Sequence, residues 1–244
     1  KAGVYPYKMD AVVVFEFIID KSYDNKYNLN YLNIQRKYFS NFILYNKYIY
    51  MSCCSVKCYT NQNENLLLNQ IPKCLKNLSY GVYPNNKNYN DKRFIYNKLF
   101  NYYPLAIFYP NNENDVSYLI KQFIKYDVKF TIRCGGHAYE PASLSESYII
   151  DVSKITKIDV NRKEKYVCVG SGVKLGNLIN ELKQYKLITP TGESSCVGLS
   201  GLVLAGGKGF LSRVIGMASD SIISLKIVNP EGNIITVDDN NYSD

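Results

Sequence analysis

The sequence predicts an α+β fold in which two lobes lie side by side, a smaller βαβ lobe followed by a larger α+β lobe. From about residue 104, strand-like and helix-like segments alternate, first as strand, helix, strand and then as strand, helix, hairpin. Each set also carries its own glycine-rich segment, at 133–139 and 192–209. We therefore place the first lobe at 69–163 and the second at 164–244, and leave 1–68 as an unassigned N-terminal segment.

The first lobe begins with a short strand, "PLAIFYP" (104–110), bounded by prolines. The segment 111–127 then opens with Asn and Asp residues that suit a helix N-cap. Its apolar residues repeat at helical spacing and define one face: Val116, Leu119, Ile120, Phe123 and Ile124. Strands at 128–133 and 148–152 follow. This order predicts a βαβ unit with a parallel pair of strands.

The second lobe repeats the pattern with a strand at 165–172 and a helix at 174–186. One side of that helix is apolar, through Leu175, Leu178, Ile179 and Leu182. The segment 221–237 alternates as a β-hairpin around Pro230–Asn233. Upstream, "AVVVFEFIID" (11–20) is typical of a buried strand, and the apolar positions over 31–50 are compatible with a helix.

Composition argues against several classes of protein. The net charge of +8 comes from lysines scattered among Asn and Tyr, which does not support nucleic-acid binding. No apolar run approaches the ~20 residues needed to cross a bilayer. The seven cysteines have no disulfide-framework spacing, and "CCSVKC" (53–58) lacks the second ligand pair of a zinc site, so we predict no metal. Compartment and oligomeric state stay unassigned.

One histidine stands out, His137, the single histidine of the chain. It follows a Gly-Gly pair at the end of a strand in "VKFTIRCGGHAYEP". Glycines there let backbone N–H groups converge on an anion, and Arg133 would add positive charge, so the turn suits a diphosphate. A tight turn with a surface histidine is the simpler alternative. A second glycine cluster at 198–209 favours an extended ligand lying between the lobes.

A rival reading rests on "VGSGVKLG" (169–176), which follows a strand and opens a helix. Its glycines, Gly170, Gly172 and Gly176, come close to a dinucleotide-binding fingerprint but miss the G-x-G-x-x-G spacing. This segment would indicate an NAD(P)-linked dehydrogenase.

The segments "RCGGHAYEPASLS" and "PTGESSCVGLSGLVLAGGKGFLSRVIGMASDSIISLKIVNPEGNIITV" resemble the berberine-bridge-enzyme-like FAD-linked oxidases. These belong to the vanillyl-alcohol-oxidase superfamily with a PCMH-type FAD-binding domain. The likeness runs from about Leu75 to Asp244. It implies a two-lobed PCMH-type FAD-binding domain with FAD as cofactor, and a small-molecule substrate and molecular oxygen as partners. From composition we expect neither nucleic acid nor membrane as a partner. The family continues into a substrate domain beyond this point, so we expect a fragment or a truncated gene product, and no catalytic base can be named.

By this resemblance, the first glycine turn binds the FAD pyrophosphate and His137 is covalently joined to the 8α-methyl group of the flavin. The resemblance places the following residues at the cofactor: Arg133, Cys134, Gly135, Gly136, His137, Ala138, Tyr139, Gly192, Ser194, Val197, Gly198, Gly201, Gly206, Gly207, Gly209 and Ile222.

The chain departs from the family at the position of a second covalent link. Many relatives carry a cysteine in a pattern like G-x-C-x-x-V-G, and this spacing falls on Ser194 rather than Cys196. A hydroxyl is a poorer nucleophile than a thiolate near neutral pH. We therefore predict a single bond, through His137, and no second link through Cys196 unless the true alignment is shifted.

The expected function is that of an FAD-dependent oxidase. A hydride from a small organic substrate (a sugar, alcohol or amine) would pass to covalently bound FAD, and oxygen would take up the electrons to give hydrogen peroxide. The alternatives are a catalytically inactive FAD-binding remnant and the NAD(P)-linked dehydrogenase.

Overall fold

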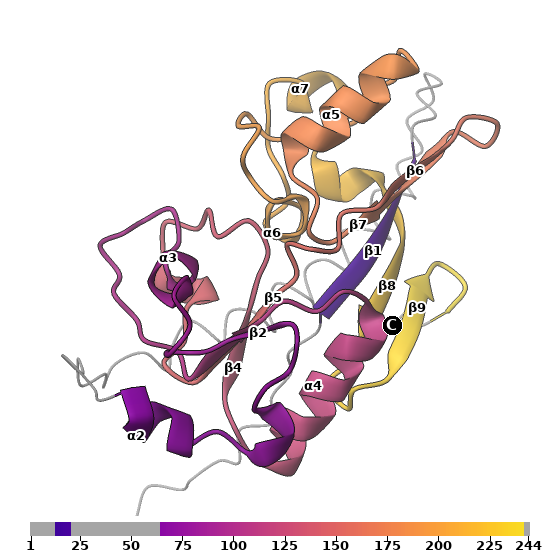
Figure 1. Cartoon of the computed structure of the whole chain (residues 1–244). Coiled ribbons are helices and arrows are strands. Elements are labelled where there is room, and N and C mark those ends of the chain that lie inside the picture. Colours follow the sequence, from indigo (N-terminus) through magenta and orange to yellow (C-terminus); the bar gives the residue numbers. More distant parts are fainter. Residues whose placement is uncertain (1–12, 21–63, 242–244) are drawn as a thin grey trace, which may run out of the picture.

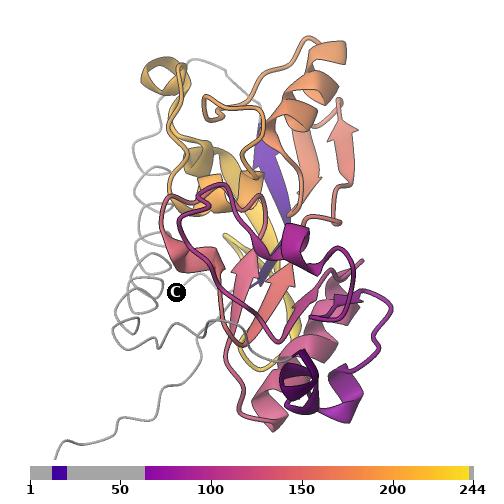
Figure 2. The ribbon, with the colours of Figure 1, turned by 60° about the vertical axis from the view of Figure 1, so that its left-hand side comes forward.

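The computed structural model describes residues 13–20 and 64–241 and shows two lobes, each built on its own sheet (Figure 1). Turning the molecule brings the two sheets into view one above the other (Figure 2). The helix expected over 31–50 and the cysteines of "CCSVKC" lie outside the described residues.

The first lobe contains a four-stranded sheet in the order β2-β3-β5-β4. Its strands are β2 (Gly81–Val82), β3 (Ala106–Phe108), β4 (Phe130–Arg133) and β5 (Tyr148–Asp151). Strands β3 and β4 both pair with β5 in parallel. The parallel arrangement is thus as predicted, but the βαβ strands are not neighbours, because β5 lies between them.

Helix α4 (Glu113–Lys125) connects β3 to β4 and covers one face of this sheet. The side chain of Asn112 accepts a hydrogen bond from the Asp115 N–H at 3.0 Å, the N-cap that the sequence predicts. The ring of Phe123 packs on Tyr148 with centroids 5.1 Å apart. Ile124, which we assigned to the buried face, is instead 51% exposed.

The opposite face of the sheet carries a second apolar cluster, so the central strands are buried on both sides as parallel strands require. Its buried members are Ile95, Ile107, Tyr109, Leu144 and Ile149. Short elements surround this lobe: α2 (Glu64–Asn69), η1 (Lys73–Leu75), α3 (Tyr89–Arg93) and η2 (Pro141–Ser143).

The second lobe contains a five-stranded sheet in the order β6-β7-β1-β8-β9, with every neighbouring pair antiparallel. Its strands are β1 (Val13–Asp20), β6 (Ile158–Asn161), β7 (Tyr166–Gly170), β8 (Ile222–Val228) and β9 (Ile234–Asp238). The N-terminal strand is confirmed. Its place is notable, because β1 comes from the segment that we left unassigned and forms the centre of this sheet. Phe17, for example, pairs with Val169 on one side and Leu225 on the other.

Four short helices lie between β7 and β8: α5 (Leu175–Gln184), α6 (Leu199–Leu204), α7 (Ser212–Ile215) and η3 (Ala218–Ser221). Because β7 and β8 are both antiparallel to β1, they run in the same direction, and the helical segment is a crossover. The buried face of α5 packs with β7, through Leu175, Leu178 and Leu182. Ile179, which we also placed on that face, is 44% exposed.

The lobes are joined through α4 and the predicted hairpin β8–β9. The buried Ser117 hydroxyl donates to the Gly232 carbonyl at 2.6 Å, and Val228 packs into the core of the first lobe. Our boundary at residue 163 falls inside the β6–β7 hairpin. Sheet membership places the change of lobe before β6 instead, between 152 and 157. In the described part of the chain, no helix combines the length and the apolarity that a membrane span needs.

Candidate functional site

The two glycine-rich segments meet where the lobes meet. The turn after β4 carries Gly135 and Gly136, and Gly198 precedes α6. An alanine Cβ at Gly135 would lie only 2.5 Å from the Gly198 nitrogen, so the two backbones touch because neither residue has a side chain. Gly136 has a φ of +59°, a left-handed conformation that glycine adopts without strain.

A glycine exchange tests this contact. Gly135→Ala is expected to lower the free energy of unfolding by about 1–3 kcal/mol, since the new methyl group meets backbone that cannot rotate away. Gly201→Ala is the matched control. It lies within α6 with no atom within 4 Å of the new Cβ, and should be neutral or stabilising by up to about 1 kcal/mol. Urea unfolding compares the two, and equal stabilities would contradict the close contact.

The turn also offers hydrogen-bond donors. Among the described residues, none accepts a hydrogen bond from the N–H groups of Gly135, Gly136 or His137. Backbone donors without partners, grouped at a left-handed turn, form the kind of concave site that binds phosphate. The turn therefore fits a diphosphate group.

His137 lies at the junction of the two segments. Its Nε2 is 3.2 Å from the Cys196 sulfur, and that sulfur is 3.1 Å from the Ser194 hydroxyl. The Tyr96 ring stacks on the imidazole with centroids 4.3 Å apart and planes inclined by 13°. Of the two residues considered for a second covalent link, Cys196 is thus the one that contacts the histidine.

Arg133 does not have the role that we expected. Its side chain is 4% exposed, and its Nε forms a 2.5 Å ion pair with Asp151. Its Nη2 donates to the Lys92 carbonyl at 2.8 Å and to the Tyr109 hydroxyl at 3.2 Å. Asp151 therefore compensates the charge of Arg133 inside the protein. The Arg133 side chain stabilises the start of the glycine turn instead of facing a ligand.

Two exposed lysines lie near Tyr109, whose hydroxyl accepts from Arg133. The Nζ atoms of Lys92 and Lys154 lie 5.7 and 5.8 Å from the centroid of the Tyr109 ring. Burial, and then the negative charge of Asp151, raise the pKa of Tyr109 to about 12. The phenol is consequently neutral at physiological pH and can accept the hydrogen bond from Arg133.

Other predicted site residues lie around this junction with different surroundings. The Cys134 thiol donates to the Ser171 carbonyl at 3.0 Å, and burial raises its pKa. Tyr139 is 78% exposed beside Ala138, whereas Ile222 is buried at the start of β8. Val197 pairs with α5 through its carbonyl, which accepts from the Leu175 N–H at 3.0 Å.

The later glycines have a packing role. An added Cβ would come within 3 Å of a neighbouring atom at each of four glycines: the Leu202 side chain at Gly192, the Met217 side chain at Gly206, the Ala218 Cβ at Gly207 and the Thr191 carbonyl oxygen at Gly209. These residues keep the loops around α6 and η3 closely packed. We assigned them to the ligand because a core gains nothing from glycine. The close packing gives a further reason for glycine at these positions, and their contact with a ligand stays a prediction.

In the rival pattern "VGSGVKLG", the glycine N–H groups already donate hydrogen bonds within the protein. The N–H groups of Gly170 and Gly172 donate to the carbonyls of Lys157 and Ile155, both at 2.8 Å. The Gly176 N–H donates to the Ser195 carbonyl at 2.9 Å. These donors are not available to a phosphate, which removes the physical basis of the NAD(P) interpretation.

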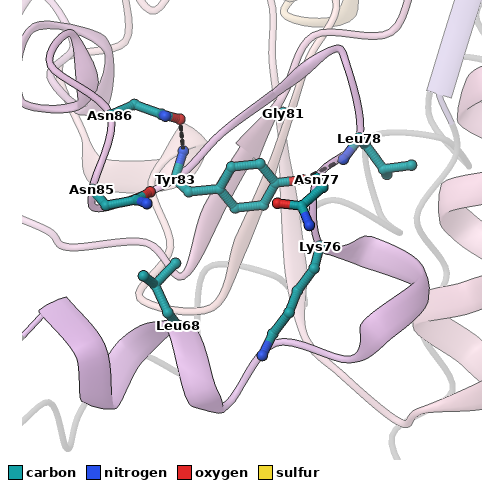
Figure 3. Close-up of a pocket in the computed structure, with 8 residues that line it drawn as sticks. All are labelled: Leu68, Lys76, Asn77, Leu78, Gly81, Tyr83, Asn85 and Asn86. Atoms are coloured by element: carbon teal, nitrogen blue, oxygen red, sulfur yellow. Dashed lines mark hydrogen bonds between the residues drawn. The ribbon is translucent and has the colours of Figure 1, made fainter.

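A separate cavity of about 440 Å³ lies in the first lobe (Figure 3). Its lining residues are Leu68, Lys76, Asn77, Leu78, Gly81, Tyr83, Asn85 and Asn86. The Tyr83 hydroxyl donates to the Leu75 carbonyl at 2.6 Å and accepts from the Leu78 N–H at 2.9 Å. None of the lining residues belongs to the glycine segments, so this cavity has no part in the candidate site. The residues that the structure describes contain no metal-binding group of three or more His, Cys, Asp or Glu side chains.

Residues 104–238 match the family model described as the FAD binding domain. The chain belongs to this FAD-binding family. The resemblance to the berberine-bridge-enzyme-like oxidases is thereby confirmed.

The curated relatives of this FAD-binding chain are named FAD-linked oxidoreductases or FAD-dependent monooxygenases. It is 37% identical over 161 residues to the uncharacterized FAD-linked oxidoreductase YgaK of Bacillus subtilis, covering 64% of this chain and 36% of YgaK. It is 29% identical over 162 residues to the FAD-linked oxidoreductase pynB of Aspergillus niger, covering 66% of this chain and 30% of pynB. The chain thus spans about a third of the length of the relatives it matches.

Solved structures agree with the fold. The 6-hydroxy-D-nicotine oxidase of Arthrobacter nicotinovorans superposes with a TM-score of 0.65 at 25% identity, over 67% of this chain and 36% of that one. The BBE-like 1 protein of Physcomitrella patens gives a TM-score of 0.64 at 28% identity, over 72% and 38% of the two chains. The predicted two-lobed PCMH-type FAD-binding fold is therefore confirmed.

Sequence reasoning missed three residues of the junction: Tyr96, Asp151 and Lys92. Tyr96 and Lys92 lie upstream of the matched domain and carry no periodic signal among 24 tyrosines and many lysines. Asp151 did offer a signal, because an acidic residue at the end of the apolar strand "YIID" needs a buried partner.

Proposed function

We propose that this chain holds FAD between its lobes with His137 as the point of covalent attachment, as the FAD-binding part of an oxidoreductase. The observation that carries the proposal is the meeting of the two glycine segments at Gly135 and Gly198, with the only histidine of the chain beside them. The unpartnered N–H groups of the turn support a diphosphate ligand at the same place.

Each residue has a distinct role in this proposal. The N–H groups of Gly135 and Gly136 bind the diphosphate, and Arg133 with Asp151 keeps the turn in place. The His137 imidazole supplies the nucleophilic nitrogen for attachment. Bound FAD would supply the acceptor for a hydride from a small organic substrate such as a sugar, alcohol or amine, and molecular oxygen would take up the electrons to give hydrogen peroxide.

Denaturing electrophoresis tests the attachment. The wild-type chain is expected to give a band with flavin fluorescence that survives denaturation, and His137→Ala should lose that band completely, because no other histidine can replace it. Ser145→Ala, a hydroxyl change outside the junction, is the control and should keep the band. A fluorescent His137→Ala band would contradict the assignment.

The number of covalent bonds needs its own measurement. A glucooligosaccharide oxidase of Acremonium strictum, which shares the fold at 21% identity, carries a 6-S-cysteinyl, 8α-N1-histidyl FAD. We keep the prediction of a single bond, and the 3.2 Å contact between Cys196 and His137 makes Cys196 the residue to test. Mass spectrometry of peptides is expected to find flavin on the His137 peptide alone. One flavin joining the His137 and Cys196 peptides would overturn the single-bond prediction.

Turnover is tested on the flavin-loaded chain. Reduction of the flavin by a sugar, alcohol or amine, with peroxide formed in air, is the expected result. Bound flavin that no substrate class reduces would favour the inactive FAD-binding remnant.

A further inference from the structure

We propose that Tyr96 is a positioning residue that holds the His137 imidazole in the orientation from which it attaches to the flavin. This inference rests on the proposed function. Its starting point is the stack of the two rings, with centroids 4.3 Å apart and planes 13° from parallel. Such geometry is a favourable aromatic contact, and it fixes the plane of the imidazole.

Tyr96 belongs to a segment that is fastened to the glycine turn, residues 92–97, which we call the strap. The Lys92 carbonyl accepts from Arg133 at 2.8 Å, the Tyr96 N–H donates to the Gly136 carbonyl at 2.8 Å, and the Asn97 amide donates to the Tyr139 carbonyl at 2.9 Å. The strap therefore contacts the turn before, at and after the Gly-Gly-His sequence. Movement of Tyr96 relative to His137 is restricted by the backbone itself.

The residue before Tyr96 anchors the strap in the core. Ile95 is 5% exposed and belongs to the apolar cluster on the face of the first sheet opposite α4. Its side chain also lies 3.5 Å from the position that a Cβ on Gly136 would take. The strap is thus held in place both by the packing of Ile95 in the core and by hydrogen bonds to the glycine turn.

The Tyr96 ring itself is not a core residue, because 63% of its surface is exposed. Burial does not explain a large aromatic side chain at this place, since the fold hides little of it. The ring stacks on His137. This combination of a rigid backbone and an exposed ring directed at one side chain is what a positioning role requires.

The imidazole is limited on a second side by Cys196, whose sulfur is 3.2 Å from Nε2. The stack fixes the ring plane, and the sulfur contact fixes the direction of one edge within that plane. Attachment depends on the angle and distance at which the nitrogen meets the 8α carbon, so loss of the stack should slow it. In the reaction one nitrogen–carbon bond forms, the methyl carbon and the imidazole nitrogen each lose one hydrogen, and the flavin takes up the two electrons, which molecular oxygen then removes as hydrogen peroxide.

The experiment uses apoprotein prepared from riboflavin-starved cells and mixed with FAD. Acid-precipitated protein reports covalent flavin with time, and gel filtration reports total bound flavin. Tyr96→Ala is expected to slow attachment about threefold to tenfold with total binding unchanged. Tyr96→Phe, which retains the ring, should stay within about twofold of wild type. The control is Leu99→Ala, since Leu99 lies beside the strap and is 89% exposed, and this variant should also match wild type.

Proton NMR provides a readout that needs no flavin. Because His137 is the only histidine, its ring protons are assigned without ambiguity, and the stacked phenol should shift them upfield. The shift should persist in Tyr96→Phe and disappear in Tyr96→Ala. The positioning role of Tyr96 is overturned if Tyr96→Ala attaches flavin at the wild-type rate, or if Leu99→Ala slows attachment equally. Either result leaves the proposed function standing. A wild-type chain that never retains flavin after acid refutes the proposed function, and this inference with it.

Discussion

Removal of residues 1–20 is expected to unfold the second lobe. Strand β1 pairs with β7 on one side and β8 on the other, so its loss breaks two ladders and divides the sheet into two hairpins. Isolated two-stranded hairpins are marginally stable at best in water. A loss of this size matches the whole stability of a typical domain, about 5–15 kcal/mol. Both new edges would also be open to association with other chains.

Hydrogen exchange measures this effect locally. The amides of Val167, Val169 and Leu225, on the partner strands, should lose protection, while those of β5 in the first lobe keep it. A chain that lacks only residues 1–10 is the control, since it retains β1. Phe17→Pro offers a milder version, because proline removes a backbone donor from a central strand. A synthetic peptide of residues 11–22 should restore protection to the shortened chain, and unchanged protection after the deletion would refute the central position of β1.

The second large effect is expected from Asp151→Ala. It would leave the guanidinium of Arg133, 4% exposed, without its counter-ion. Breaking a buried pair in this way typically costs about 3–5 kcal/mol, because an uncompensated charge stays inside the protein. Arg133 Nη1 already has no hydrogen-bond partner among the described residues, so the remaining contacts cannot compensate. Since Arg133 lies at the foot of the glycine turn, flavin attachment should weaken together with stability.

Asp159→Ala is the matched control. Asp159 forms an ion pair with Lys157 in which both side chains are more than half exposed, and such pairs contribute about 0–1 kcal/mol. Urea unfolding of the two variants should therefore differ by several kcal/mol. The double variant Arg133→Met with Asp151→Ala should recover part of the loss, because it removes the unpaired charge. If Asp151→Ala and Asp159→Ala were equally stable, the Arg133–Asp151 pair would not stabilise the protein as we describe.

Local patterns in the sequence predicted most elements of the fold. The apolar spacing over 113–125 and 175–184 marked α4 and α5, and alternation marked the β8–β9 hairpin. The same patterns could not say which strands become neighbours, because pairing depends on contacts between distant segments. For this reason β5 between β3 and β4, and β1 between β7 and β8, were not foreseen.

The candidate site divides in the same way. Glycine chemistry and the family resemblance pointed to His137 and to two glycine segments facing one ligand, but not to the direct backbone contact between Gly135 and Gly198. The inward turn of Arg133 was not foreseen either, because a sequence cannot show that Asp151 ends the neighbouring strand in register with it. Counting along the sequence selected Ser194 over Cys196, whereas the fold of the loop brings the sulfur against the imidazole.

The position of β1 has a consequence for synthesis in the cell. Strand β1 ends at Asp20, whereas its partner strands β7 and β8 end at Gly170 and Val228. At about 5–20 residues per second, roughly 10–40 s pass between the synthesis of β1 and the completion of β8. Until β7 is made β1 lacks both of its partners, and until β8 is made one of its edges stays open. The nascent chain is therefore expected to depend on chaperones, and translation speed should affect the yield of folded protein.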